Sequence, residues 1–176
     1  MIMLSEVFDL TLLYNGSNIV PEAEYLIRSN ELKDYTKSVN KQYNLNIQIK
    51  EFTYDTQTFH KELAKHDDGR EGGQRCRACY KIRMREAYQY ALANDFDYFT
   101  TVMTISRQKN SIILNEIGND LNREYASDKY FFSDFKKKNG ILKSNEIIKE
   151  YDMYRQEYCG CAFSYQQYLK GKVSNG

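Results

Sequence analysis

The sequence predicts an α/β protein with a Rossmann-like, mainly parallel sheet and helices on both of its faces. Two observations support this fold class. Short apolar runs alternate with longer helical patterns along the chain, and turn residues separate them. Strand–helix–strand units are connected in a right-handed sense, which makes their strands parallel.

The N-terminal half contains two predicted strands and three predicted helices, the first of which is the end of a helix over residues 1–8. Residues 9–14 form a buried apolar run that stops at Asn15-Gly16, which is typical of a strand followed by a turn. A helix is expected to start at Pro21, since proline suits a first turn, and to continue through residue 39. Residues 45–52 alternate apolar and polar side chains, which predicts a second strand. A short helix over 55–63 follows, with Asp55 or Thr56 as its N-cap.

The C-terminal half continues the alternation. A polar loop over 66–75 leads into a helix that ends near Asn94, and the tail from Gln166 is polar and is expected to end loosely. Between them the patterns predict a strand over 96–103, a helix over 111–121, a short strand over 130–132 and a helix over 144–151.

The proposed sheet has one edge where a binding site is expected. In open parallel sheets, ligands bind at the carboxyl ends of the strands. The loops there carry Asn15-Gly16, the glycine-rich approach to Cys76, residues 106–109 and Asp134. The sequence therefore predicts that these four loops share one edge.

Composition restricts the class of protein. A chain of 176 residues is typical of one domain, and a net charge of +1 means that any nucleic-acid binding must rest on local basic patches. A mean hydropathy of −0.72, with no long apolar run and no leader pattern at the start, predicts a cytoplasmic protein without a membrane segment. Cytoplasmic thiols stay reduced, so cysteine pairs are expected to bind metal or react.

Two of the four cysteines form a Cys-x-x-Cys pair, Cys76 and Cys79, after Gly72 and Gly73. Two intervening residues let both sulfurs face one point, and a helix N-terminus favours the thiolate that binds metal or acts as nucleophile. The spacing alone leaves three options open, namely metal ligands, a redox dithiol, or two unrelated helix residues.

The other two cysteines are Cys159 and Cys161, separated by one glycine. The glycine allows the chain to bend enough to join the sulfurs in a strained, easily reduced disulfide, which suits redox cycling. The alternative is a four-cysteine zinc site with Cys76 and Cys79, for which the one-residue spacer is less usual.

A lysine-rich turn forms the third candidate site. Lys136, Lys137 and Lys138 follow Asp134, and such clusters bind phosphate backbones unless they are merely a solvated surface. Arg107 and Lys109 add positive charge on the same proposed edge. Asp134 could be a metal ligand or an acid/base group, although an aspartate in this position often only caps a turn. The two histidines have no partner at ligand spacing and receive no role.

With these motifs read, the chain resembles the iron–sulfur, cobalamin-independent epoxyqueuosine reductases. The matching stretches are Tyr14-Asn-Gly-Ser-Asn-Ile with Pro21-Glu-Ala-Glu-Tyr25, Glu71-Gly-Gly-Gln-Arg-Cys-Arg-Ala-Cys79, Asp95-Phe-Asp-Tyr-Phe-Thr-Thr101, Ile105-Ser-Arg-Gln-Lys-Asn110, Ser133-Asp-Phe-Lys-Lys-Lys-Asn-Gly140 and Tyr154-Arg-Gln-Glu-Tyr-Cys-Gly-Cys-Ala-Phe-Ser164.

The resemblance implies an oxidoreductase that reduces epoxyqueuosine to queuosine in tRNA, the last step of queuosine biosynthesis. It implies a fold similar to the adenine-nucleotide alpha-hydrolase group and a 4Fe-4S cluster held in part by Cys76 and Cys79, with an additional iron also compatible. Cys159 and Cys161 would be the redox-active pair, and an electron donor of unknown identity would reduce them again after each turnover. The resemblance does not assign roles to Asp134 or to the basic residues near it. We add the hypotheses that Asp134 is catalytic and lies next to the metal and that the basic residues contact the tRNA.

The family pattern also includes a first strand and a loop with adjacent cysteines that supply the remaining cluster ligands. The expectation is one epoxyqueuosine-reductase-like domain over residues 1–176 that lacks this strand and loop and is N-terminally truncated relative to the family. The competing hypotheses are a non-catalytic, zinc-stabilised tRNA-binding module, in which all four cysteines are structural, and an inactive fragment.

Overall fold

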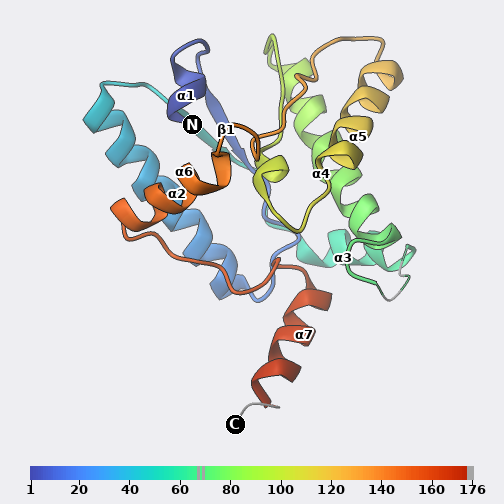
Figure 1. The fold of residues 1–176 in the computed structure, drawn as a ribbon. Coiled ribbons are helices and arrows are strands. Elements are labelled where there is room, and N and C mark those ends of the chain that lie inside the picture. Colours follow the sequence, from blue (N-terminus) through green and yellow to red (C-terminus); the bar gives the residue numbers. More distant parts are fainter. Residues whose placement is uncertain (67, 69, 174–176) are drawn as a thin grey trace. The chain divides into compact units, whose positions relative to one another are not determined.

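The computed structural model describes residues 1–66, 68 and 70–173, which form helices and a small parallel sheet (Figure 1). The chain divides into two compact units. The first unit contains residues 1–60 and the segment from residue 147 onward, and the second contains residues 61–146. The mixed, helix-rich α/β class predicted from the sequence is confirmed. In chain order the elements are α1 (Ile2–Ser5), β1 (Thr11–Tyr14), α2 (Glu22–Tyr43), β2 (Gln48–Glu51), α3 (Thr56–Ala64), α4 (Gln74–Ala93), the 3-10 turn η1 (Val102–Ile105), α5 (Ser111–Glu124), α6 (Gly140–Glu150) and α7 (Ala162–Val173).

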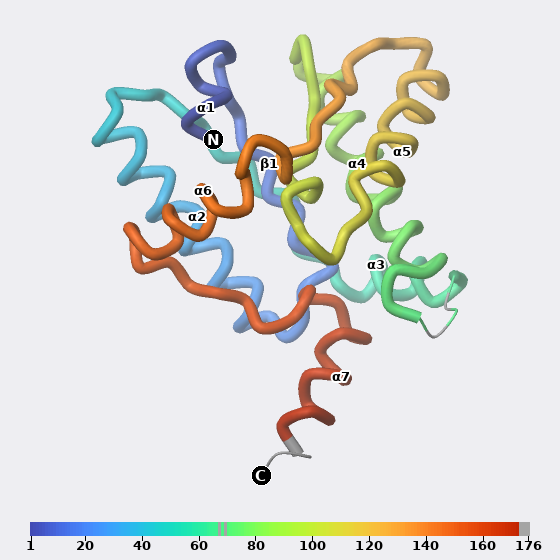
Figure 2. Tube along the Cα trace, viewed as in Figure 1, coloured from blue at the N-terminus to red at the C-terminus, as the bar shows by residue number. Residues whose placement is uncertain are grey.

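The first unit is built on a β1–α2–β2 connection. The two strands pair in parallel, with Thr11 opposite Gln48, as the alternation of strand and helix predicts. The amide of Asn40, in the last turn of α2, donates to the Ile47 carbonyl and accepts from the Ile47 N–H, both at 2.9 Å. This pair of bonds fixes where the chain leaves the helix and enters β2. In Figure 2 the trace after α6 runs back along α2.

The second unit packs α4 against α5. Tyr88 and Leu114 are fully buried between these helices. The Tyr88 hydroxyl donates to the Asn122 side chain at 2.8 Å, and the same oxygen of Asn122 accepts from the Tyr130 N–H. Gly118 lies directly against the Tyr130 ring, because a Cβ there would come within 2.1 Å of it.

The predicted third and fourth strands are much shorter than expected. Of the runs 96–103 and 130–132, only Phe99 and Tyr130 pair, in one parallel bridge. Thr101 instead caps a 3-10 turn through its side chain, and the Thr104 hydroxyl bonds the Thr101 carbonyl at 3.3 Å. Threonine side chains that bond the local backbone compete in this way with strand pairing.

The helix predictions agree with the structure, with a few exceptions. The Asp55 carboxylate accepts the Thr58 N–H at 2.9 Å, so Asp55 is the N-cap predicted for α3. The tail from Gln166 is helical through residue 173, where α7 ends, and the loose end predicted for it lies in residues 174–176, outside the described residues. The predicted loop over 66–75 lies partly outside the described residues, at positions 67 and 69, and α4 begins at Gln74, inside the range predicted for that loop. The helix predicted over 144–151 begins earlier, since α6 starts at Gly140.

In each unit a hydrogen bond joins the segments that follow two predicted strands, and the glycine-rich approach to Cys76 belongs to the second unit. In the first, the Ser17 hydroxyl after β1 donates to the Thr53 carbonyl after β2, at 3.2 Å. In the second, the Lys136 ammonium reaches the Ser106 carbonyl at 3.0 Å. Within the described part of the chain, none of the helices combines the length and apolar character that a bilayer crossing needs.

Candidate functional site

Cys76 and Cys79 lie in the first two turns of α4, and both are half-buried. Residues three apart on a helix share one face, with their Cβ atoms about 5–6 Å apart. A disulfide needs Cβ atoms about 3.5–4.5 Å apart, so the two cysteines would have to come closer together before they could be bridged. The helical geometry suits two ligands of one metal centre and leaves the redox dithiol as an alternative.

The loop before α4 supports the first thiol. The Gly72 N–H donates to Cys76 Sγ at 3.3 Å, and Gly72 has a positive φ of 77°, which glycine adopts at little cost. The Asp68 carboxylate accepts the Gln74 N–H at 2.6 Å, and this bond holds the pKa of Asp68 below its usual range. A charged carboxylate at the start of α4 stabilises the helix that carries both cysteines.

Cys76 and Cys79 match an iron–sulfur cluster in donor chemistry and supply half of its usual ligands. Such clusters are held by thiolates, usually four, and hydrogen bonds to the sulfurs tune their potentials, as the Gly72 N–H can do here. No group of three or more His, Cys, Asp or Glu residues within the described ranges is placed to hold a metal ion. The helix thus offers a two-thiolate half-site.

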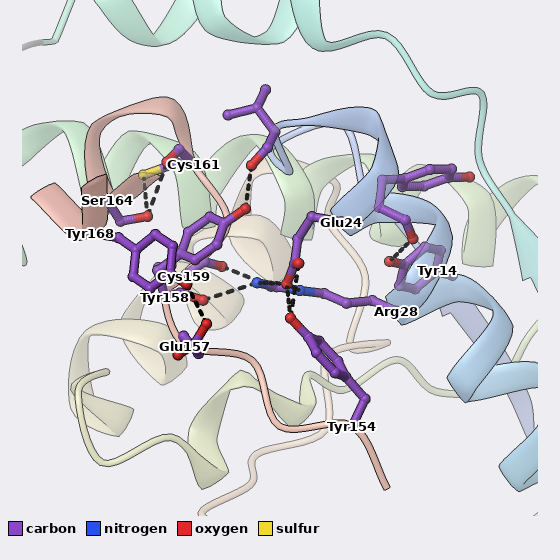
Figure 3. A network of polar contacts seen from close by, with 12 residues as sticks. Tyr14, Glu24, Arg28, Tyr154, Glu157, Tyr158, Cys159, Cys161, Ser164 and Tyr168 are labelled. Atoms are coloured by element: carbon purple, nitrogen blue, oxygen red, sulfur yellow. Dashed lines mark hydrogen bonds and ion pairs between the residues drawn. The ribbon is translucent and has the colours of Figure 1, made fainter. Parts of the chain in front are cut away.

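Cys159 and Cys161 lie in a non-helical loop of the first unit, just before α7 (Figure 3). Neither is in a disulfide in this structure. The Arg28 guanidinium donates to the carbonyls of Tyr158, at 3.0 Å, and Cys159, at 3.1 Å. The Cys161 carbonyl accepts the Tyr165 N–H at 2.9 Å, which places Cys161 at the start of α7.

Two tyrosines next to this loop are kept in the neutral form. Burial raises the pKa of Tyr158 to about 12, and its hydroxyl donates to the Val20 carbonyl at 2.6 Å. Burial, followed by its bonds to Glu24, also raises the pKa of Tyr154. Both hydroxyls therefore act as hydrogen-bond donors around the cysteine loop at neutral pH.

Asp134 lies in the turn that follows Tyr130. Its carboxylate accepts from the Ser111 hydroxyl at 3.2 Å and from the Lys136 N–H at 3.3 Å. It lines an open cavity of about 240 Å³ at the N-terminus of α5. The lining residues are Ser111, Ile112, Asn115, Glu116, Asn119, Phe132, Asp134 and Lys137.

The basic residues separate into two groups. The Lys136 ammonium donates to the carbonyls of Ser106 and Lys109, so this lysine holds the 106–109 loop in place. Lys137, Lys138 and Arg107 are exposed, whereas Lys109 and Lys136 are half-buried. The exposed residues are available for an anionic partner.

The structure brings together some of the predicted site residues and not others. Asp134, Lys136 and Lys109 meet in the second unit, which also contains Cys76 and Cys79. Cys159 and Cys161 belong to the first unit, and a four-cysteine site with Cys76 and Cys79 stays a prediction. Sequence reasoning missed Arg28, although its i,i+4 spacing from Glu24 was a usable signal for an ion pair.

The fold and the cysteines define an α/β protein with one thiol pair on a helix and a second thiol pair in a loop, groups that can bind a metal or react. The chain belongs to the family described as Epoxyqueuosine reductase QueH, whose model matches residues 1–167. It is 37% identical over 161 residues to the epoxyqueuosine reductase QueH of Streptococcus pyogenes serotype M1, covering 92% of this chain and 63% of the relative. Identity to the Staphylococcus aureus (strain Mu50) protein of the same name is 35% over 169 residues, covering 93% of this chain and 69% of the relative. The chain thus spans just under two thirds of the streptococcal relative.

Proposed function

We propose that this chain reduces epoxyqueuosine to queuosine in tRNA. The observation that carries the proposal is the family match over residues 1–167, a range that includes both cysteine pairs. The curated relatives are named for this activity. A cytoplasmic location is part of the proposal, because that is where a tRNA substrate would be found. A Rossmann-like sheet in one domain, similar to that of the adenine-nucleotide alpha-hydrolases, is part of the proposal, and the parallel pairing found in each unit supports it.

Cys159 and Cys161 are assigned as the redox dithiol. Converting an epoxide to an alkene and water takes two electrons and two protons. Two thiols release two electrons and two protons when their S–H bonds break and one S–S bond forms, so the reaction balances. A reducing partner, such as a low-molecular-weight dithiol, then returns the disulfide to the dithiol for the next turnover.

Cys76 and Cys79 are assigned as ligands of an iron–sulfur cluster. When bound, the cluster supplies electron transfer and a Lewis-acidic iron near the epoxide oxygen. A four-iron cluster takes about four protein ligands, and α4 offers two thiolates. The remaining ligands would have to be Cys159 and Cys161, non-cysteine groups, or residues outside this sequence. Asp134 is assigned as a neighbour of the metal centre, where it can hold a proton or a second iron.

Lys137, Lys138 and Arg107 are assigned to the tRNA backbone, with Lys109 and Lys136 shaping the same loops. Exposed lysine and arginine side chains supply the salt-dependent part of such binding. Phe132, which is 61% exposed, lies at the rim of the same cavity as Lys137. An exposed aromatic ring beside basic residues is suited to unpaired nucleotides.

The first test is the iron, acid-labile sulfide and zinc content of the chain purified without oxygen, followed by an epoxyqueuosine assay. Iron and sulfide in cluster stoichiometry, together with turnover, would support the proposal. A zinc:protein ratio near one, without iron, sulfide or turnover, would replace it with the non-catalytic, zinc-stabilised tRNA-binding module. A chain that folds but binds neither metal nor tRNA would be an inactive fragment.

A further inference from the structure

One guanidinium ties the cysteine loop to the first turns of α2. Arg28 Nη1 donates to the Cys159 carbonyl at 3.1 Å, and Arg28 Nη2 donates to the Tyr158 carbonyl at 3.0 Å (Figure 3). The guanidinium is planar and rigid, so it fixes the two carbonyls relative to each other. Arg28 also lies over the Tyr158 ring, with 5.4 Å between the guanidinium carbon and the ring centroid.

Arg28 is itself held in one orientation. Its Nε and Nη2 each lie 2.8 Å from Glu24 Oε1, and the Tyr154 hydroxyl donates to both Glu24 oxygens at 2.9 Å. The side chains of Glu24 and Arg28 are only 10% and 11% exposed. A buried, paired arginine of this kind has little freedom to rotate away and break its hydrogen bonds to the loop.

The glycine between the cysteines completes the attachment. Its carbonyl accepts the Val20 N–H at 2.8 Å, and its φ of 115° is one that L side chains rarely adopt. A Cβ on Gly160 would lie 3.1 Å from Arg28 Nη1 and 3.1 Å from Ile19 Cγ1. The loop therefore has one tightly specified conformation, observed here with both cysteines as thiols.

We propose that Arg28 is a positioning residue for the redox pair, which holds Cys159 and Cys161 in their dithiol conformation. The inference rests on the proposed function, in which these two thiols are oxidised to a disulfide by the substrate and reduced again by a dithiol donor. Forming the S–S bond requires the loop backbone to adjust, and the four contacts of Arg28 and Gly160 resist that adjustment. Arg28 thereby makes the disulfide easier to reduce, so that it favours return to the active dithiol.

The test is the reduction potential of this pair in wild type, Arg28→Gln and Arg28→Lys. The full chain is equilibrated in dithiothreitol or glutathione redox buffers, alkylated and digested with trypsin. Cleavage after Arg155 and Lys170 gives a peptide that contains Cys159 and Cys161 and neither Cys76 nor Cys79. The oxidation state of Cys159 and Cys161 is then measured separately from that of Cys76 and Cys79.

In Arg28→Gln the equilibrium constant for disulfide formation is expected to rise about 10-fold to 100-fold, because hydrogen bonds from a charged group are lost. That corresponds to a midpoint potential lower by about 30–60 mV. Arg28→Lys keeps the charge without the fork, so an intermediate shift is expected. A wild-type potential in Arg28→Gln would overturn the proposal.

Controls separate this result from a general loss of structure and from the proposed function. Arg85→Gln removes a surface arginine that pairs with Glu124 at 2.8 Å in the other unit, and it should leave the potential unchanged. If Arg28→Gln does not fold, Tyr154→Phe removes only the support of Glu24, and a smaller shift in the same direction is expected, with no shift contradicting the proposal. The potential is measured without tRNA, so an absence of epoxyqueuosine turnover would refute the proposed function without affecting this result.

Discussion

The positions of Cys76 and Cys79 are set by one helix, whereas those of Cys159 and Cys161 are set by residues far away in the sequence. On α4 the relative position of the two cysteines follows from helical geometry. A nearby contact from outside the helix is the hydrogen bond that the Gly72 N–H donates to Cys76 Sγ. The Cys159 loop is held by Arg28, which lies 131 positions earlier. A helical pair keeps a constant spacing, which suits metal ligands. The spacing of a pair in a loop depends on contacts with distant residues, here Arg28 and Val20, so these contacts can bias whether an S–S bond forms or breaks.

The largest expected effect comes from removing one cysteine of each pair. Cys159→Ser should lower turnover by at least about 1000-fold, as loss of a reacting group does, while iron content stays near the wild-type value. Cys79→Ser should remove most of the bound iron together with turnover. Iron analysis and an epoxyqueuosine assay on the same samples measure both. Equal loss of iron and turnover in Cys159→Ser would end the division of roles between the pairs.

A matched pair of glycine substitutions compares how tightly the two regions are specified. Gly160→Ala introduces strain at a φ of 115° and places a Cβ 3.1 Å from two neighbouring atoms, so a loss of about 2–3 kcal/mol in unfolding free energy is expected. Gly72→Ala introduces backbone strain alone, since nothing lies within 4 Å, and about 1 kcal/mol is expected. Urea unfolding measures both. Equal losses of unfolding free energy in the two variants would mean that the Arg28 and Ile19 side chains move aside at little cost.

A smaller effect is expected from the exposed lysines. Lys137→Glu with Lys138→Glu should weaken tRNA binding about 10-fold or more at low salt and reduce the slope of log affinity against log salt by about two. Lys81→Glu, an exposed lysine on α4, is the control and should change neither value. Unchanged binding in the double variant would show that the turn is only a solvated surface.

The smallest effect concerns pH and the core of the second unit. Burial raises the pKa of Tyr130 to about 12, and its hydroxyl donates to Asn115 at 2.8 Å. A tyrosine ionises near pH 10 when unfolded, so the contribution of Tyr130 is complete below about pH 10 and is lost as the pH rises towards 12.

Tyr130→Phe should therefore cost about 1 kcal/mol at pH 7, from the lost hydrogen bond, and less at pH 11. Urea unfolding at the two pH values measures the difference. The same deficit at both would contradict the raised pKa. The first unit, which lacks this residue, is not expected to change.

Predictions from the sequence succeeded where local interactions decide the structure. The helix starting near Pro21, the Asp55 N-cap and the helix beginning at Ser111 all follow from patterns within one or two turns. Of the strand predicted over 96–103 only Phe99 pairs, because the Thr101 and Thr104 side chains bond to nearby backbone instead.

The candidate site divides in the same way. The cysteine spacings and the helix that carries Cys76 and Cys79 could be read from the chain alone, since a helix is held by bonds between residues four apart. The contact of Arg28 with the Cys159 loop and the bond of the Lys136 ammonium to the 106–109 loop could not, because they depend on how the chain packs. Such contacts join residues far apart in the chain, and their partners are chosen by the packing of the whole unit, which no local pattern records.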